Sequence, residues 1–257
     1  MLFLLSPAKA LDYDTPAHVA NHTQPLFTRQ SAELIEVLKT QSPQQISNLM
    51  KLSDKLSGLN VARYEAWSPK FTANNSKQAA LAFNGDVYEG LDAKTLGESD
   101  LQWAQAHICI LSGLYGVLRP LDWMQPYRLE MGTALATARG KNLYQFWGSE
   151  IANYLNERAA ADTSPVVVNL ASEEYFKVVD RRVLKPRVVT CVFQELKAGQ
   201  YKIISFKAKR ARGLMVRYAI DNKLSSVRKL EAFDLEGYGY SPDVSEPDRL
   251  VFRRQSA

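Results

Sequence analysis

The sequence predicts an α/β or α+β fold in which a mixed β-sheet is flanked by helices. Two observations support this prediction. Short apolar segments with strand character alternate along the chain with longer segments whose apolar residues recur at helical spacing. In addition, no internal repeat, low-complexity tract or Pro/Gly/Ser-rich linker divides the 257 residues, so we expect one integrated domain over residues 1–257.

Five segments are typical of β-strands because they are short, apolar and bounded by turn-forming residues. Val166–Val168 is apolar at consecutive positions, which favours a central strand buried on both faces. A hairpin is expected between the last two strands, with its turn near Ala198–Gln200. The predicted strands are Leu2–Leu5, Ile108–Leu111, Val166–Leu170, Val188–Phe193 and Tyr201–Phe206.

Six segments show the apolar periodicity of helices. One start is marked by a capping box, since Ser42 precedes Pro43 and Gln45 stands three positions after the serine. The predicted helices are Ala32–Leu38, Pro43–Leu56, Asp100–Ala106, Leu143–Asn156, Ala208–Ile220 and Val227–Phe233.

Composition excludes several classes of protein. With 46% apolar and 23% charged residues, the chain can form a core and is not disordered. No apolar stretch is long enough to span a membrane, and the run Met1–Leu5 is too short for a secretion signal, so we interpret it as a buried strand. Cys109 and Cys191 cannot form a disulfide framework, which favours the reducing cytoplasm.

Positive charge is concentrated in one segment. The net charge is +5, yet residues 177–217 hold twelve Lys/Arg and two Asp/Glu, so the rest of the chain is mildly acidic. Such asymmetry favours a polyanionic partner. The alternative is a solvated basic face without a ligand.

The segment Ser42–Trp67 predicts a helix-hairpin-helix element. Gly58 permits a tight turn at Leu56–Asn60, and backbone N–H groups at a helix start can bind a phosphate without reading sequence. Such elements usually have glycine where Asn60 stands, but asparagine also tolerates left-handed geometry. The alternative is an ordinary αα-hairpin. The candidate DNA contacts are Lys51, Lys55, Ser57, Gly58, Asn60 and Arg63.

A second basic cluster spans Phe206–Tyr218. It follows a predicted strand and opens a predicted helix, which places cations at a sheet edge where phosphate can bind. A solvated basic face is again the alternative. The candidate DNA contacts here are Lys207, Lys209, Arg210, Arg212 and Arg217.

Three polar residues are weak catalytic candidates. Lys9 and Glu173 follow predicted strands, and Asp86 lies in a loop rich in turn formers, so a lysine nucleophile or phosphate clamp could meet an acid or base. The alternatives are turn residues and a salt-bridged surface lysine. Residues expected near any pocket are Arg119, Asp122, Tyr127 and Arg128.

Metal and cofactor sites are not expected. His18 and His22 have a spacing that can share a metal on a helix, but the surrounding residues form a weak helix. With three histidines and two cysteines, carboxylates are the remaining ligands for a metal.

Several motifs together resemble the YaaA family of bacterial peroxide stress proteins. The resemblance spans nearly the whole chain, with matching order and spacing. It implies a cytosolic protein of one unusual fold that has a positive cleft and a helix-hairpin-helix element, binds double-stranded DNA, and is linked to lower free iron and less DNA damage. The motifs are Ser6–Lys9, Phe83–Tyr88, Leu111–Gly116, Asn169–Lys177 and Phe206–Tyr218.

Two functions from different classes are therefore carried forward, and direct iron sequestration by carboxylates, suggested by the link to iron, is a third hypothesis. The first is a monomeric stress protein that binds double-stranded DNA with little sequence preference through phosphate contacts. The second is an enzyme that acts on DNA or on a nucleotide-like phosphate compound through a basic cleft.

Overall fold

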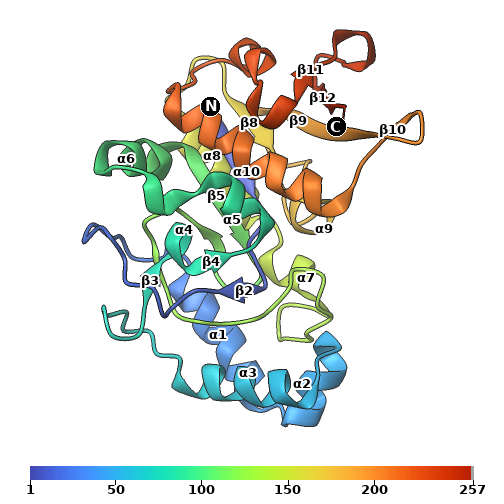
Figure 1. Cartoon of the computed structure of the whole chain (residues 1–257). Helices are drawn as coiled ribbons and strands as arrows, with labels where there is room; N and C mark the ends of the chain where they lie inside the picture. Colours follow the sequence, from blue (N-terminus) through green and yellow to red (C-terminus); the bar gives the residue numbers. More distant parts are fainter. Residues whose placement is uncertain (256–257) are drawn as a thin grey trace.

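A mixed β-sheet forms the centre of the computed structural model, which describes residues 1–255 (Figure 1). Its eight strands within that range are β1 Leu2–Leu5, β5 Ile108–Ser112, β6 Gly116–Leu118, β8 Val166–Asn169, β9 Arg187–Lys197, β10 Gln200–Lys202, β11 Gly239–Tyr240 and β12 Arg249–Arg254. The strand order is β11-β12-β9-β8-β1-β5-β6, and β10 pairs with β9 as a hairpin. The strands from β12 to β5 are mutually parallel, whereas β6, β10 and β11 are antiparallel to their neighbours.

Strand β1 lies in the middle of the core. Phe3 pairs with Ile108 of β5 on one side and with Val168 of β8 on the other. Phe3, Leu4 and Leu5 are completely buried, and each such side chain stabilises the fold by about 1.5–3 kcal/mol. The N-terminal apolar run is therefore a central strand, as predicted.

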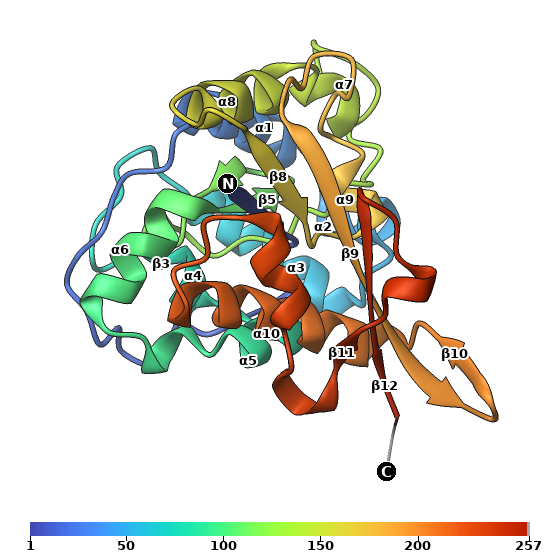
Figure 2. The same cartoon turned by 90° about the horizontal axis from the view of Figure 1, so that it is seen from above.

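Helices cover both faces of the sheet (Figure 2). One face carries α1 Thr28–Lys39, α7 Leu143–Trp147 and α8 Glu150–Ala159; the other carries α5 Asp86–Leu91, α6 Glu98–His107 and α10 Ser205–Asp221. Within residues 1–255, no helix combines the length and the apolarity that crossing a bilayer requires.

Short elements connect these layers. Strand β2 (Ala10–Leu11) pairs with β4 (Phe83–Asn84), and β3 (Lys77–Gln78) pairs with β7 (Trp123–Met124). The remaining short helices are α4 Ala79–Ala82, α9 Glu173–Phe176 and the 3-10 turns η1 Ala93–Thr95, η2 Val227–Ala232, η3 Leu235–Gly237 and η4 Pro242–Val244.

The predicted fold class is confirmed, and most predicted elements lie near their expected bounds. Three differ. Phe206 belongs to α10 and not to the preceding strand, since strand pairing ends at Lys202. The helix expected over Leu143–Asn156 is broken into α7 and α8 at Gly148, whose φ of 49° interrupts the helix. Finally, residues 227–232 form a 3-10 helix.

The helix pair predicted over Ser42–Trp67 exists, but its turn is elsewhere. Helices α2 (Pro43–Met50) and α3 (Asp54–Ala66) pack together, and the Ser42–Gln45 capping box is formed. The turn lies at residues 51–53, where Lys51 adopts a left-handed conformation. The prediction of a turn at Leu56–Asn60 is therefore wrong, because this segment is part of α3.

Helix α3 runs straight through that segment. Ser57 and Asn60 are fully buried, and their side chains donate to the carbonyls of Ser53 and Leu56 one turn earlier. Both side chains are therefore removed from the candidate DNA contacts. Gly58 is an exposed residue inside the helix, without positive φ.

Two glycines allow α5 and α10 to cross at backbone contact. A Cβ atom on Gly90 would lie 2.2 Å from the carbonyl oxygen of Arg210, and one on Gly213 would lie 1.8 Å from that of Val87. Only a residue without a side chain fits at either position. This crossing brings α5 against the basic helix α10.

Gly213→Ala is expected to destabilise the protein by at least about 2–3 kcal/mol, because the new methyl group meets fixed backbone and not a flexible side chain. The free energy of unfolding is measured by urea denaturation.

Gly58→Ala is the matched control. Nothing lies within 4 Å of its added Cβ, so alanine should stabilise α3 by about 0.5–1 kcal/mol. An unchanged free energy of unfolding in Gly213→Ala would contradict the close packing of α5 and α10. A lower free energy of unfolding in Gly58→Ala would contradict the helical position of Gly58.

His107 makes stability depend on pH. Its ring stacks on Trp103 with centroids 4.0 Å apart, and Nδ1 donates to the Trp103 carbonyl over 2.7 Å. Burial lowers the His107 pKa below its ordinary 6.5, so on acidification the unfolded chain takes up this proton first. Stability therefore falls as the pH drops from about 7.5 to 5.5, and the fall should be smaller in His107→Gln. If the free energy of unfolding, measured with urea, falls equally in the parent and in His107→Gln over this pH range, His107 is not the cause of the pH dependence.

Candidate functional site

The carboxyl ends of β1 and β8 form a topological switch point. The chain leaves β1 and next joins the main sheet at β5 on one side, whereas it leaves β8 and next joins the sheet at β9 on the other side. Open α/β sheets hold ligands in the crevice between such strands. Ser6 follows β1 and Ser172 lies after β8, and the Ser172 backbone N–H donates to Ser6 Oγ over 2.9 Å.

Hydroxyl groups gather at this edge. Tyr88 donates to the Ser6 carbonyl over 3.1 Å, and the Tyr127 hydroxyl lies 2.6 Å from Ser112 Oγ at the end of β5. Burial raises the pKa of Tyr88, Tyr127 and Tyr175 well above the ordinary value. These phenols stay protonated at neutral pH and act as hydrogen-bond donors rather than as bases.

Lys9 is held by a carboxylate in the same region. Its Nζ lies 2.8 Å from Glu130 Oε1, and Nη2 of Arg128 lies 3.0 Å from that same oxygen. Lys9 is 68% exposed, whereas Arg128 and Glu130 are 18% and 19% exposed. An ion-paired ammonium suits a phosphate clamp better than a nucleophile, which must lose its proton.

Helix α3 lies below the central sheet in the view of Figure 1. Tyr64 donates to the carbonyl oxygen of Arg128, which fixes α3 to the loop. The neighbouring Arg63 is half-buried, and its Nη1 lies 3.4 Å from Asn60 Oδ1. Burial and the positive charge of Arg128 lower the pKa of Arg63.

The three catalytic candidates come from segments that meet here, but they form no joint set. Asn84 pairs with Ala10 one residue after Lys9, and Glu173 follows Ser172. No hydrogen bond or ion pair in residues 1–255 joins Lys9 to Asp86 or Glu173. The exposed Glu173 opens α9, and Asp86 opens α5.

Lys207 does not present a free charge. It pairs over 3.1 Å with Glu195, a carboxylate that is 1% exposed. Arg254 pairs with the same carboxylate over 2.9 Å, and Tyr238 donates to it. Lys207 thus helps to compensate the charge of a buried acid. This pairing could not be predicted from the sequence, because Glu195 and Lys207 belong to different elements.

Two more cations of the cluster are neutralised. Arg210 lies 2.6 Å from Glu236 and 3.9 Å from Glu89, and Arg217 lies 2.9 Å from Asp221. Three of the five candidate DNA contacts in the Phe206–Tyr218 cluster are therefore ion-paired, and their role in DNA binding stays a prediction. Carboxylates from α5, η3 and α10 itself approach these cations.

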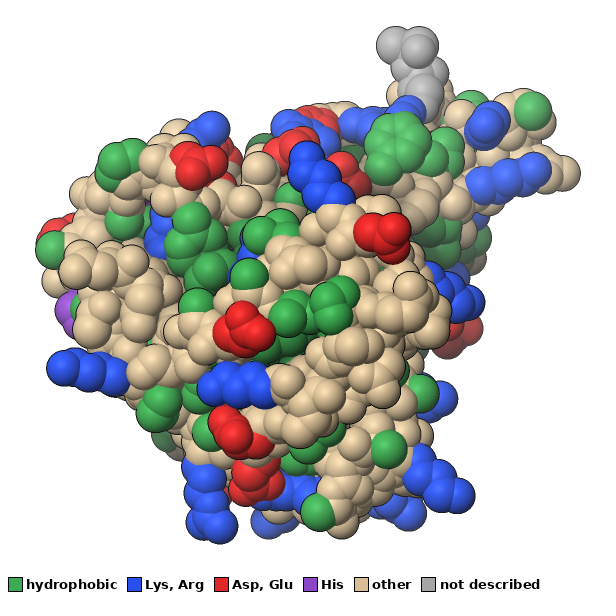
Figure 3. Space-filling model, turned by 90° about the horizontal axis from the view of Figure 1, so that it is seen from below, with side chains coloured by type: hydrophobic (Ala, Val, Ile, Leu, Met, Phe, Trp, Pro, Cys, Tyr) green, Lys and Arg blue, Asp and Glu red, His purple; other side chains and the backbone are tan. Residues whose placement is uncertain are grey.

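Other cations of this region are exposed. Lys197 and Lys202 lie on the β9–β10 hairpin, and Lys209 lies on the first turns of α10; none of the three forms an ion pair in residues 1–255. The hairpin projects from the body and shows blue and green side chains at its end (Figures 1 and 3). Arg212 is partly buried, and burial lowers its pKa.

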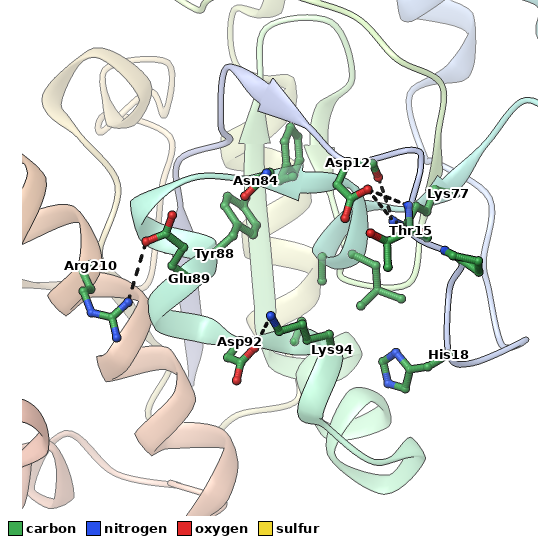
Figure 4. Close-up of a pocket in the computed structure, with 15 residues that line it drawn as sticks. Asp12, Thr15, His18, Lys77, Asn84, Tyr88, Glu89, Asp92, Lys94 and Arg210 are labelled. Atoms are coloured by element: carbon green, nitrogen blue, oxygen red, sulfur yellow. Dashed lines mark hydrogen bonds and ion pairs between the residues drawn. The ribbon is translucent and has the colours of Figure 1, made fainter.

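A pocket of about 450 Å³ lies beside α5 (Figure 4). Its charged groups form three pairs whose nitrogen–oxygen distances are 3.8–3.9 Å. Because the charges balance, this pocket has no surplus with which to attract an anion. The pairs are Asp12–Lys77, Asp92–Lys94 and Glu89–Arg210.

Neither cysteine is poised to react with peroxide. Burial raises the pKa of Cys109 and Cys191 to about 12, so both remain thiols at neutral pH, and the thiolate is the reactive form. In residues 1–255, no group of three or more His, Cys, Asp or Glu side chains is arranged to hold a metal ion.

Sequence reasoning identified part of this site. Tyr127 and Arg128, which were expected near a pocket, lie at the sheet edge, where Tyr127 contacts Ser112 and Arg128 pairs with Glu130. Arg119 and Asp122 instead form a buried pair at 2.7 Å that closes their own loop. Glu130 was missed, although it stands only two residues from Arg128 in the same loop.

These observations define an α/β protein with a hydroxyl- and cation-lined site at the carboxyl edge of its sheet. A family model described as "Peroxide stress protein YaaA" matches residues 1–244. The chain therefore belongs to the YaaA family of peroxide stress proteins, and the resemblance inferred from its motifs is confirmed.

Similar relatives carry the description "UPF0246 protein". One from Polaromonas sp. (strain JS666) is 79% identical over 257 residues and covers all of both chains. One from Polaromonas naphthalenivorans is 78% identical over 254 residues, covering 99% of this chain and 98% of its own. One from Bordetella petrii is 66% identical over 256 residues and covers all of both chains.

Glu195→Gln is expected to destabilise the protein by about 3 kcal/mol, because it leaves Lys207 and Arg254 without their buried counter-charge. Urea denaturation measures the change. Glu231→Gln removes an exposed carboxylate and should stay within about 0.5 kcal/mol of the parent. Similar stability of both variants would show that the buried pair is not required.

Proposed function

We propose that this peroxide stress protein binds double-stranded DNA with little sequence preference. The observation that supports this most directly is a segment without acids: residues 196–220 contain seven Lys/Arg and no Asp/Glu. Three of these cations, Lys197, Lys202 and Lys209, are exposed at or beside a projecting hairpin.

A projecting basic hairpin suits a DNA backbone. Each lysine that neutralises a phosphate releases condensed counterions, and this supplies affinity that does not depend on base sequence. The major groove also admits a two-stranded ribbon. Ile203 and Phe206 are each 60% exposed near these lysines, which adds apolar surface for contact with sugars or bases.

Helices α2 and α3 offer a second contact. Lys51 in the turn and Lys55 in the first turn of α3 are exposed, and neither forms an ion pair in the described part of the chain. The face seen in Figure 3 mixes Lys and Arg with Asp and Glu. Helices α2 and α3 would therefore contribute a few phosphate contacts to DNA binding, and not a continuous basic surface.

The proposal includes the cytoplasm as location and a monomer as binding unit. It also includes the link to free iron and DNA damage that the family resemblance implies.

An enzyme that acts on DNA or on a nucleotide-like phosphate compound is the second candidate. The topological switch point after β1 and β8 favours it, because segments carrying Lys9, Asp86 and Glu173 meet there. The ion pair of Lys9 with Glu130 favours a role in holding a phosphate.

The variant with Lys197, Lys202 and Lys209 all replaced by Gln tests the DNA proposal. The slope of log affinity for duplex DNA against log salt should become shallower by about 2–3, which corresponds to three lost phosphate contacts. Fluorescence anisotropy with a labelled duplex at several salt concentrations measures this slope.

The control removes the same charge elsewhere, with Lys39, Lys70 and Lys94 replaced by Gln. It should keep the parent slope to within about one unit. Equal slopes for the hairpin variant and the parent would remove the hairpin from the proposal. No salt-dependent binding by the parent would end the DNA hypothesis.

A further inference from the structure

Three cations from separate segments converge at the sheet edge. Lys9 follows β1, Arg63 lies on α3, and Arg128 lies in the loop that α3 contacts through Tyr64. Lys9 and Arg128 share a single oxygen of Glu130, at 2.8 Å and 3.0 Å. Arg63 precedes Tyr64, whose hydroxyl donates to the Arg128 carbonyl, and the positive charge of Arg128 adds to burial in lowering the pKa of Arg63.

The other groups around these cations supply no balancing charge. Tyr13 and Tyr64 interact electrostatically with this group, but burial raises the pKa of each phenol well above 10. Both are neutral at physiological pH. Within the described chain, Glu130 is the one carboxylate paired with any of the three cations, so the group carries a net charge of about +2.

Donors in the group are also unused. Arg128 Nε is buried without a hydrogen-bond partner in residues 1–255. Arg63 is half-buried, and its one hydrogen bond in that range is long, at 3.4 Å to Asn60 Oδ1. Arg63 forms no ion pair within residues 1–255, and a half-buried guanidinium group without a counter-charge destabilises a fold, since burial removes water that would otherwise solvate it.

We infer that Lys9, Arg63 and Arg128 form a binding site for a dianionic phosphoryl group. A terminal phosphate carries a charge close to −2 and matches the local surplus, whereas a backbone phosphodiester carries −1. Guanidinium forks bind phosphate oxygens in pairs, and the ammonium of Lys9 adds a point charge. By pairing with both Lys9 and Arg128, Glu130 would hold these two side chains in place for the phosphoryl group.

Two sources supply this chemistry: the phosphate of a mononucleotide or the 5′-phosphate at a DNA end. The site uses none of Lys197, Lys202 and Lys209, so it does not rest on the proposed hairpin contact. It lies at the switch point beside Ser6 and Ser172, where the fold places ligands.

Isothermal titration calorimetry of the full-length protein tests the site with three probes: inorganic phosphate, a deoxynucleoside 5′-monophosphate, and a short oligonucleotide with either a 5′-phosphate or a 5′-hydroxyl. Arg63→Gln should weaken binding of the phosphorylated probe at least about tenfold, which corresponds to one lost charge-assisted contact. Arg63→Lys should fall between Arg63→Gln and the parent, because it keeps the charge but loses the fork. Arg29→Gln, which removes a cation that is 90% exposed on α1, should bind like the parent.

Thermal unfolding separates a binding role from a structural one. Without ligand, Arg63→Gln should unfold at the same temperature as the parent or higher, because it removes an unbalanced cation that repels Arg128. With saturating mononucleotide, the parent should gain thermal stability and the variant should gain less. A lower unfolding temperature without ligand, together with unchanged binding, would assign Arg63 to structure and overturn the site.

The probes also distinguish the source of the phosphate. Binding of the mononucleotide, or preference for the 5′-phosphorylated oligonucleotide over its 5′-hydroxyl form, supports the site and identifies its ligand class. Failure of every phosphorylated probe at millimolar concentration overturns it. The hairpin variant lacking Lys197, Lys202 and Lys209 should bind the mononucleotide like the parent, so loss of DNA binding and loss of this site are separable.

Discussion

Parallel pairing of β1 between β5 and β8 is the constraint on which the rest of the structure depends. Four consecutive apolar residues have no exposed side, so this strand is stable only at the centre of a sheet. Once it is central, the loops after β1, β5 and β8 must emerge at one edge. That edge gathers Ser6, Lys9, Ser112 and Ser172, which lie far apart in the sequence. The polar site is thus a consequence of hydrophobic packing.

The crossing of α5 and α10 decides what happens to the basic segment. Because Gly90 and Gly213 let the two backbones touch, Glu89 lies within reach of Arg210. In the first turn of α10, Lys207 pairs with the buried Glu195, which Arg254 also contacts. The basic segment therefore divides into two parts. Some of its cations form ion pairs within the fold, and others are exposed to solvent at or beside the hairpin.

Local signals in the sequence were enough for most elements of the fold. Val166–Val168, the β9–β10 turn and the Ser42 capping box lie where they were predicted. The turn between α2 and α3 was predicted at Gly58, because glycine favours turns. Ser53 and the acidic Asp54 are the better signal, since they mark the start of α3. Ion pairs between distant segments, such as that of Arg210 with Glu236, follow from tertiary packing, and no periodicity encodes them.

Charge balance separates structural cations from candidate binding residues better than charge density does. An exposed ion pair contributes about 0–1 kcal/mol, so neither its presence nor its loss identifies a site. A half-buried cation without a counter-ion is different, because its cost persists in every folded molecule unless an anion offsets it. At the sheet edge Arg63 meets that condition within residues 1–255, and on α10 Arg212 meets it, whereas Arg128, Arg210 and Arg217 each pair with a carboxylate. The sheet edge differs from α10 because Lys9, Arg63 and Arg128 have only the carboxylate of Glu130 paired with them in the described chain, and this imbalance is the argument for a ligand there.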